Sequence, residues 1–174
     1  MRSEADKNKV LEFISALGGR VRGTGKIYLT GGATALLQGW RDMTVDIDIK
    51  SDPEPPGLFE AIADLKEELD VNLELASPDQ FIPELPGWRE RSEFIGRFGH
   101  LDFYHYDFFA QALSKLERGH ARDLLDVGAM LERGLITGNQ LQALFQEIRP
   151  ALIRYPAIDI PGFAEAVEKF CREN

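Results

Sequence analysis

The chain has 174 residues, of which 44% are hydrophobic and 28% charged, and this composition is typical of one globular domain or of one domain with a small addition. No apolar run approaches the ~20 residues that span a bilayer, and the polar N-terminal segment is unlike a signal peptide, so we expect a cytoplasmic protein without a membrane segment. A net charge of −9 argues against a broad surface for duplex DNA, because such surfaces neutralise phosphates with lysine and arginine.

Hydrophobic periodicity in the first 106 residues alternates between helical and strand patterns, with glycine or proline at the breaks. Strict alternation over 45–49 predicts a strand, whereas apolar residues at helical spacing over 5–17 predict a helix. The other expected elements are strand 27–29, helix 33–38, helix 58–69, strand 71–75 and a hairpin formed by 92–98 and 101–106. Three prolines keep 77–88 irregular.

Helical spacing dominates the remainder of the chain. The expected helices cover 107–117, 121–133, 138–148 and 162–172. The fold class that follows is α+β, with a mixed β-sheet, flanking helices and a helical C-terminal extension. We expect residues 1–106 to form the core and residues 107–174 to form a helical part packed on it.

Two adjacent glycines, Gly31 and Gly32, lie between strand 27–29 and helix 33–38. Glycine at such a turn lets the backbone approach a ligand closely, because no Cβ stands in the way. The N-terminus of the following helix favours an anion such as a triphosphate. This turn is therefore a candidate phosphate site.

Two carboxylates follow the glycine pair on the next strand. Asp46 and Asp48 are separated by one residue, so an alternating strand places both on the same face. Two bare carboxylates at this spacing repel each other, whereas a divalent cation between them removes the conflict. Oxygen ligands of this kind suit Mg²⁺ or Mn²⁺, so the pair is a candidate metal site.

The glycine pair and the acidic strand together resemble the polymerase-β-like nucleotidyltransferase superfamily. Its signature is a hydrophobic residue, Gly, and Gly or Ser, followed about a dozen residues later by an acidic–hydrophobic–acidic–hydrophobic strand. Thr30 departs from the first position of this pattern. The wider stretch 28–36, with Arg41 and Thr44, is similar to one branch that contains the abortive-infection type toxin nucleotidyltransferases and related uncharacterised bacterial proteins.

The resemblance implies a minimal nucleotidyltransferase fold and an NTP bound with its phosphates over the glycine pair. It implies that the two aspartates hold Mg²⁺ and take part in catalysis. The residues expected to bind the nucleotide are Gly31, Gly32, Thr34, Arg41 and Thr44.

Most members of the superfamily add a third acid from a neighbouring strand, as a metal ligand or as a base. Glu74 on strand 71–75 is the first candidate, and Asp102 on the second arm of the hairpin is the alternative. Lys115, which precedes Arg122-Asp123 and Asp126, is similar to a second pattern of the toxin branch. There the lysine would reach the triphosphate and offset negative charge.

The function that the resemblance implies is Mg²⁺-dependent transfer of an NMP from an NTP to a hydroxyl of an RNA or protein acceptor. The toxin relatives imply tRNA or a protein as the acceptor and an antitoxin as a partner. Two alternatives stay open: a non-catalytic nucleotide-binding regulatory module, and a protein-interaction module with a degenerate site. The three histidines lack the spacing of a metal site, so packing or surface positions are expected for them.

Overall fold

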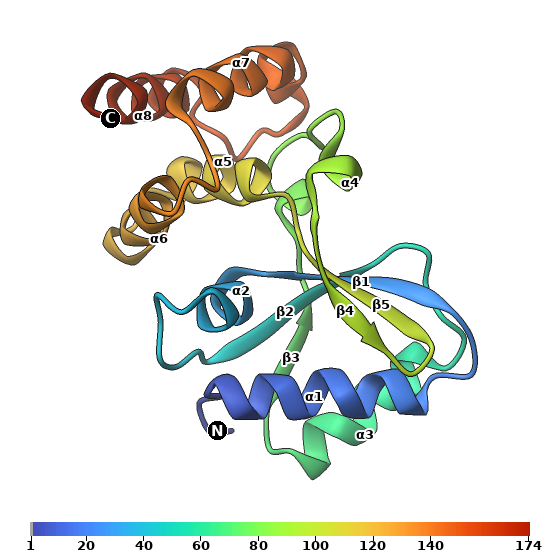
Figure 1. Ribbon diagram of the computed structural model, residues 1–174. Helices are drawn as coiled ribbons and strands as arrows, with labels where there is room; N and C mark the ends of the chain where they lie inside the picture. The colour runs from blue at the N-terminus through green and yellow to red at the C-terminus, as the bar shows by residue number, and fades with distance from the viewer. Residues whose placement is uncertain (1) are drawn as a thin grey trace. The chain divides into compact units, whose positions relative to one another are not determined.

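The computed structural model describes residues 2–174, and the chain forms two units that alternate along the sequence (Figure 1). The first unit contains the chain up to Ser77 and, after an interruption, Ser92–Tyr106. The second contains Pro78–Arg91 and Asp107–Asn174. Within the described chain, no helix combines the length and the apolar character that crossing a bilayer requires.

The first unit is built on a five-stranded mixed sheet, as the sequence predicts. Its helices are α1 (Lys7–Arg20), α2 (Gly31–Gln38) and α3 (Leu58–Glu68). Its strands are β1 (Gly25–Thr30), β2 (Asp46–Ser51), β3 (Asn72–Leu75), β4 (Glu93–Phe98) and β5 (Leu101–His105).

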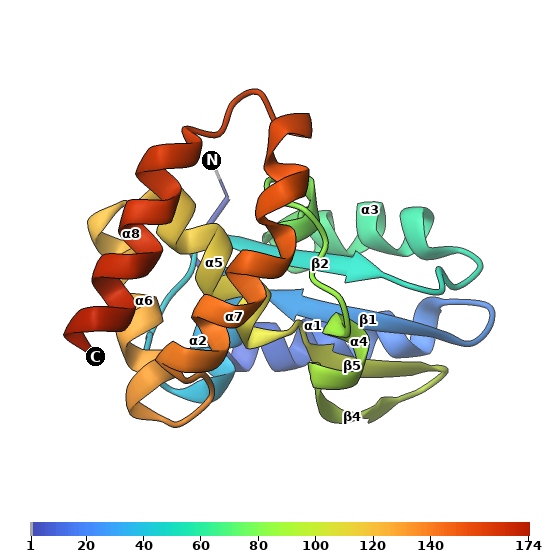
Figure 2. The same ribbon diagram turned by 90° about the horizontal axis from the view of Figure 1, so that it is seen from above.

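The strand order is β3-β2-β1-β5-β4, and Figure 2 shows β2, β1, β5 and β4 side by side in that order. β1 is antiparallel to β2 and parallel to β5. β2 and β3 are parallel, whereas β4 and β5 form an antiparallel hairpin. This order puts the glycine turn at the end of the central strand, directly beside the acidic strand.

One face of the sheet is apolar and forms the core of the first unit. Strand residues at alternate positions are buried there: Ile27, Leu29, Ile47, Ile49, Leu73, Leu101 and Phe103. α1 and α3 lie side by side against this face (Figure 1), because each presents a stripe of apolar residues to it. The period of two along each strand sends the intervening side chains to the opposite face, which is therefore the polar one.

The second unit is helical. Its elements are the 3₁₀ turns η1 (Pro78–Gln80) and η2 (Arg149–Arg154) and the helices α4 (Trp88–Arg91), α5 (Phe108–Arg118), α6 (Ala121–Glu132), α7 (Gly138–Ile148) and α8 (Ile160–Glu173). α5 is the central helix and contacts η1, α6, α7 and α8. Its start is fixed by Asp107, which caps the helix through Phe109 N and forms an ion pair with Arg91.

The segment 78–91 belongs to the second unit, whereas a division of the chain at residue 106 would assign it to the first. Its prolines keep most of it irregular, yet Ile82, Leu85 and Trp88 are buried. These apolar side chains give the segment a packing role in the second unit, although it lies between two strands of the first.

Candidate active site

The glycine turn joins β1 directly to α2. Thr30 ends β1 with an extended backbone, and Gly31 opens α2 with a φ of +63°. Glycine adopts this left-handed conformation without the steric cost that a Cβ imposes. The helix therefore starts two residues earlier than residue 33, where the sequence predicts it, and its positive N-terminal end lies at the turn.

The structure brings Asp48 against this turn. A Cβ built on Gly31 would lie 3.1 Å from Oδ2 of Asp48. A Cβ on Gly32 would overlap the hydroxyl of Thr44 and lie 3.5 Å from a guanidinium nitrogen of Arg41. All five are residues that the sequence predicts for the site, and the lack of Cβ atoms at the turn is what permits this close approach.

Thr44 also fixes the start of the acidic strand. Its hydroxyl donates a hydrogen bond to the carbonyl oxygen of Asp46 at 3.0 Å. The backbone of the same residue forms an antiparallel bridge with Ala5. Thr44 thus connects the wall of the glycine turn to the first carboxylate, whose side chain is half-buried.

The register of the sheet places the three predicted acids on the polar face. Thr30 of β1 pairs with Asp48 of β2, and Asp48 pairs with Glu74 of β3. Asp46 lies two residues before Asp48 and therefore on the same face. Neighbouring strands are ~4.8 Å apart, so Glu74 starts from a backbone position next to Asp48.

The carboxylates do not form a ready-made cluster. Among residues 2–174, no three acidic, histidine or cysteine side chains are gathered closely enough to hold a metal ion together. The donor set nevertheless suits Mg²⁺, because it consists of carboxylate oxygens next to the N-terminal end of α2, which attracts phosphate oxygens. Side-chain rotation of the exposed Glu74 would be needed to complete it.

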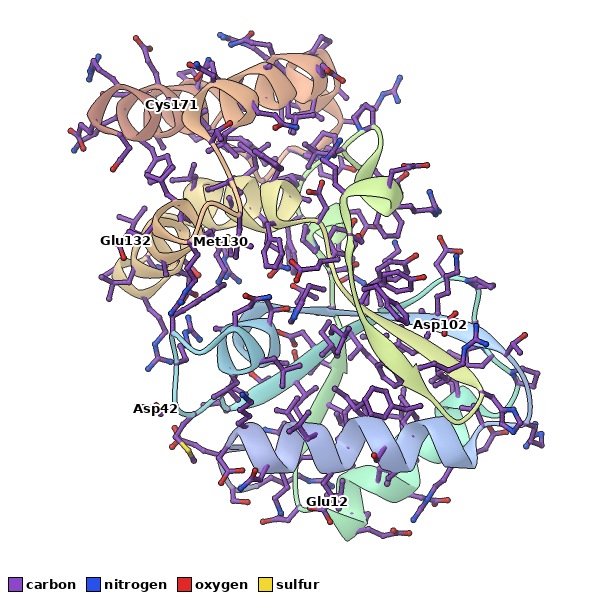
Figure 3. The ribbon with its side chains drawn as sticks, viewed as in Figure 1. Glu12, Asp42, Asp102, Met130, Glu132 and Cys171 are labelled. Atoms are coloured by element: carbon purple, nitrogen blue, oxygen red, sulfur yellow. The ribbon has the colours of Figure 1, made fainter. Side chains whose placement is uncertain are left out.

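Asp102, the alternative third acid, lies elsewhere. It pairs with Lys26 across β5 and β1, four residues along the strand from Thr30, which is a separation of about 13 Å. Arg97 binds its carboxylate at two points, 2.7 and 3.1 Å, and this hydrogen-bonded guanidinium lowers the pKa of Asp102. Figure 3 places Asp102 at the end of the sheet away from Asp42, which follows α2. The register therefore favours Glu74.

Residues 8–155 match the model of a family described as "Nucleotidyltransferase of unknown function (DUF6036)". The chain belongs to this family. No curated protein and no solved structure matches it. The matched range contains the glycine turn and all three acids of the polar face, so the assignment confirms the nucleotidyltransferase prediction at the level of the family.

In this member of the nucleotidyltransferase family, Thr34 is completely buried. Its hydroxyl donates to the carbonyl oxygen of Leu29 at 3.1 Å and lies 3.1 Å from Nδ1 of His105. Since the hydroxyl proton goes to Leu29, Nδ1 of the imidazole is the donor to Thr34. This arrangement ties α2 to β1 and β5, and it favours a positioning role for Thr34 over direct contact with a nucleotide.

His105 is a member of this arrangement that the sequence pattern does not single out. Burial lowers the pKa of its imidazole to about 4, so the ring is neutral at physiological pH. The sequence predicts packing or a surface position for this histidine, and the structure places it in packing, 5% exposed.

The residues around Lys115, which resemble a second nucleotidyltransferase pattern, form an ion-pair network inside the second unit. Nζ of Lys115 lies 2.7 Å from Asp126 and 3.4 Å from Asp123, and Arg118 lies 2.7 Å from Asp123. Lys115 and both aspartates are buried, at 5% or less exposure. Because its charge is already paired, Lys115 has a clear structural role in joining α5 to α6.

Proposed function

We propose that the protein transfers a nucleoside monophosphate from an NTP to a hydroxyl of an RNA or protein acceptor, in a Mg²⁺- or Mn²⁺-dependent reaction. The observation that carries this proposal is the contact of the Asp48 carboxylate with the Gly31 turn, at the N-terminus of α2. In this arrangement the turn proposed to bind phosphate lies next to a carboxylate proposed to bind the metal. Membership of the nucleotidyltransferase family supports an NTP as the substrate.

The glycine turn would hold the triphosphate. The positive N-terminal end of α2 attracts phosphate oxygens to the turn. Arg41, which lies next to Gly32, supplies a permanent positive charge on the same side. These groups orient the NTP so that its α-phosphate faces the acidic strand.

Asp46, Asp48 and Glu74 are the residues that would hold the metal. When bound, the cation neutralises the phosphate charge and polarises the α-phosphate. The acceptor oxygen forms a bond to the α-phosphorus, the bond to the bridging oxygen of the β-phosphate breaks, and pyrophosphate leaves with that electron pair. The exposed carboxylate of Glu74, on the strand next to Asp48, would accept the hydroxyl proton.

Other parts of the expected function rest on resemblance. A contact of Lys115 with the triphosphate stays a prediction, because its ammonium group is paired with two buried aspartates. A toxin role, a tRNA acceptor and an antitoxin partner likewise stay predictions. They bear on the biological setting of the reaction and not on its chemistry.

One observation favours a second candidate, a nucleotide-binding module without transferase activity. No three metal-binding side chains converge within residues 2–174. A site that binds an NTP through the glycine turn and cannot assemble the third acid would sense the nucleotide without using it.

The experiment is label transfer from each α-³²P-NTP with Mg²⁺ or Mn²⁺, in the presence of total RNA or cell lysate. The test variant is D46N/D48N, and the matched control is E12Q/D42N, which removes two exposed acids elsewhere in the first unit (Figure 3). We expect transfer by the wild type and the control and none by D46N/D48N. Metal-dependent NTP binding without transfer would establish the second candidate, and absence of NTP binding would refute both.

A further inference from the structure

A pocket lies in the first unit, at the end of the sheet where β1 and β5 begin. It has a volume of about 340 Å³, and its walls include Lys26, Arg97, His100 and Asp102. Sites for small ligands start at a volume of roughly 300 Å³. The pocket is therefore large enough for a phosphate group with part of its sugar.

The charges around this pocket favour an anion. Arg97 offsets the carboxylate of Asp102 through their two-point contact. Lys26 then leaves the pocket with an excess positive charge, and the imidazole of His100 adds a hydrogen-bonding group. Both are exposed, and the Lys26 ammonium lies 5.8 Å from the centre of the Tyr104 ring, so it sits over an aromatic surface.

Backbone packing keeps this pocket open. Gly25, in its wall, fits so closely that a Cβ would lie 2.8 Å from the carbonyl oxygen of Pro53. The turn of the β4–β5 hairpin is held on α1 by a 3.1 Å hydrogen bond from His100 N to Gly18 O. Backbone contacts within the first unit therefore hold two parts of the pocket wall in place.

The pocket and the acidic strand share the polar face of the sheet. Lys26 and Thr30 stand four residues apart on β1, and Thr30 pairs with Asp48. The separation of about 13 Å corresponds to about four stacked nucleotides at 3.4 Å each. A chain with a phosphate in the pocket can therefore place its terminal hydroxyl at the acids.

Aromatic rings cover the interval between these two places. Tyr28 and Tyr104 stack with their centroids 5.1 Å apart, and Phe94 meets Tyr104 edge-on at 5.4 Å. Phe94 is 56% exposed and Tyr104 is half-buried, whereas Tyr28 is buried and supports the Tyr104 ring from within the unit. Accessible aromatic side chains beside a positively charged pocket are a combination on which bases of single strands stack. A protein acceptor has no comparable need for both features.

We propose that this pocket binds a backbone phosphate of a single-stranded polynucleotide acceptor. The inference rests on the proposed transferase function and names the class of its acceptor. The pocket acts in binding and takes no part in the chemical step.

The test is binding of a fluorescein-labelled octauridylate to the full chain, measured by anisotropy between 25 and 200 mM NaCl without NTP or metal. The variant K26Q/H100N replaces Lys26 and His100 of the pocket, and K169Q/H120N makes the same exchanges at exposed positions of the second unit. We expect K26Q/H100N to raise Kd at least fivefold at 25 mM NaCl. We also expect it to reduce the salt slope by about 0.7 for each phosphate that the variant no longer neutralises. K169Q/H120N should match the wild type. Equal Kd and slope for the two variants would overturn the proposal.

Two further measurements distinguish a backbone phosphate from free phosphate, and the RNA-binding proposal from the proposed transferase function. The pocket binds free phosphate, and the proposal is wrong, if inorganic phosphate or UMP shifts the His100 NMR signals while K26Q/H100N leaves the Kd for RNA unchanged. RNA binding by D46N/D48N that still depends on the pocket supports it, whatever the transfer assay shows. Active transfer together with pocket-independent RNA binding refutes this inference alone.

Discussion

Replacing Gly32 by alanine tests whether the glycine turn is required by packing. A Cβ at this position would overlap the Thr44 hydroxyl and lie 2.6 Å from its Cβ. Forcing extra atoms into a filled space costs about 1–3 kcal/mol, and loss of the bond from Thr44 to Asp46 O adds about 1 kcal/mol. The better helix propensity of alanine offsets about 1 kcal/mol. We expect the free energy of unfolding to fall by about 1–3 kcal/mol.

The assay is urea unfolding followed by far-UV circular dichroism, with G19A as the matched control. Gly19 lies in α1, and a Cβ there would meet nothing within 4 Å. G19A should therefore raise the free energy of unfolding by roughly 0.5–1 kcal/mol. The reasoning is refuted if G32A is as stable as G19A. Adding T44G to G32A should restore part of the stability, because it removes the atoms that the new Cβ meets.

Three further predictions concern buried polar groups. The pKa of His105 is below that of an unfolded histidine, so stability is full above pH 6.5 and falls as the pH drops towards 4. Between pH 6.5 and pH 5, the free energy of unfolding should fall by about 2 kcal/mol less in H105Q than in the wild type, as measured by urea unfolding at both pH values. K115M should lower the free energy of unfolding by about 3–5 kcal/mol, because the buried carboxylates of Asp123 and Asp126 both lose their ion pair with the Lys115 ammonium group, and K169M at an exposed position should not. T34V should cost about 1–3 kcal/mol, because Leu29 O and the buried imidazole each lose a hydrogen bond; an unchanged unfolding midpoint would contradict its positioning role.

The sequence predicts the elements of the first unit well because the periods of helix and strand are strong there. The alternation around Asp46 and Asp48 identifies their shared face without any knowledge of neighbouring strands. The pairing of Asp48 with Glu74 needs the strand order, and this depends on which strands meet in space. The choice between Glu74 and Asp102 therefore rests on the structure.

Buried polar contacts are what the sequence pattern could not provide. The bond between Thr34 and His105 joins residues 71 positions apart, and no local feature of the sequence indicates that they meet. The pattern around Lys115 contains residues that the structure joins by ion pairs, but a spacing across two helices carries no information on burial. The packing of the segment 78–91 could not be predicted for a related reason. Its prolines predict irregular backbone, and they carry no information on where Trp88 packs.

The alternation of the two units along the chain has a consequence for folding during synthesis. The first unit lacks β4 and β5 until residues 93–105 have emerged, and the second begins with 78–91 well before the helices that complete it. The first unit is complete only when Tyr106 has emerged, and by then 78–91 is present without the helices of its own unit, although domains of many proteins fold one after another from the N-terminus. A chain cut after Tyr106 would keep 78–91 without its helical partners and expose Ile82 and Trp88 to solvent. Dissecting the protein into working halves therefore requires rejoining the chain, with 78–91 replaced by a short loop in one half and fused ahead of α5 in the other.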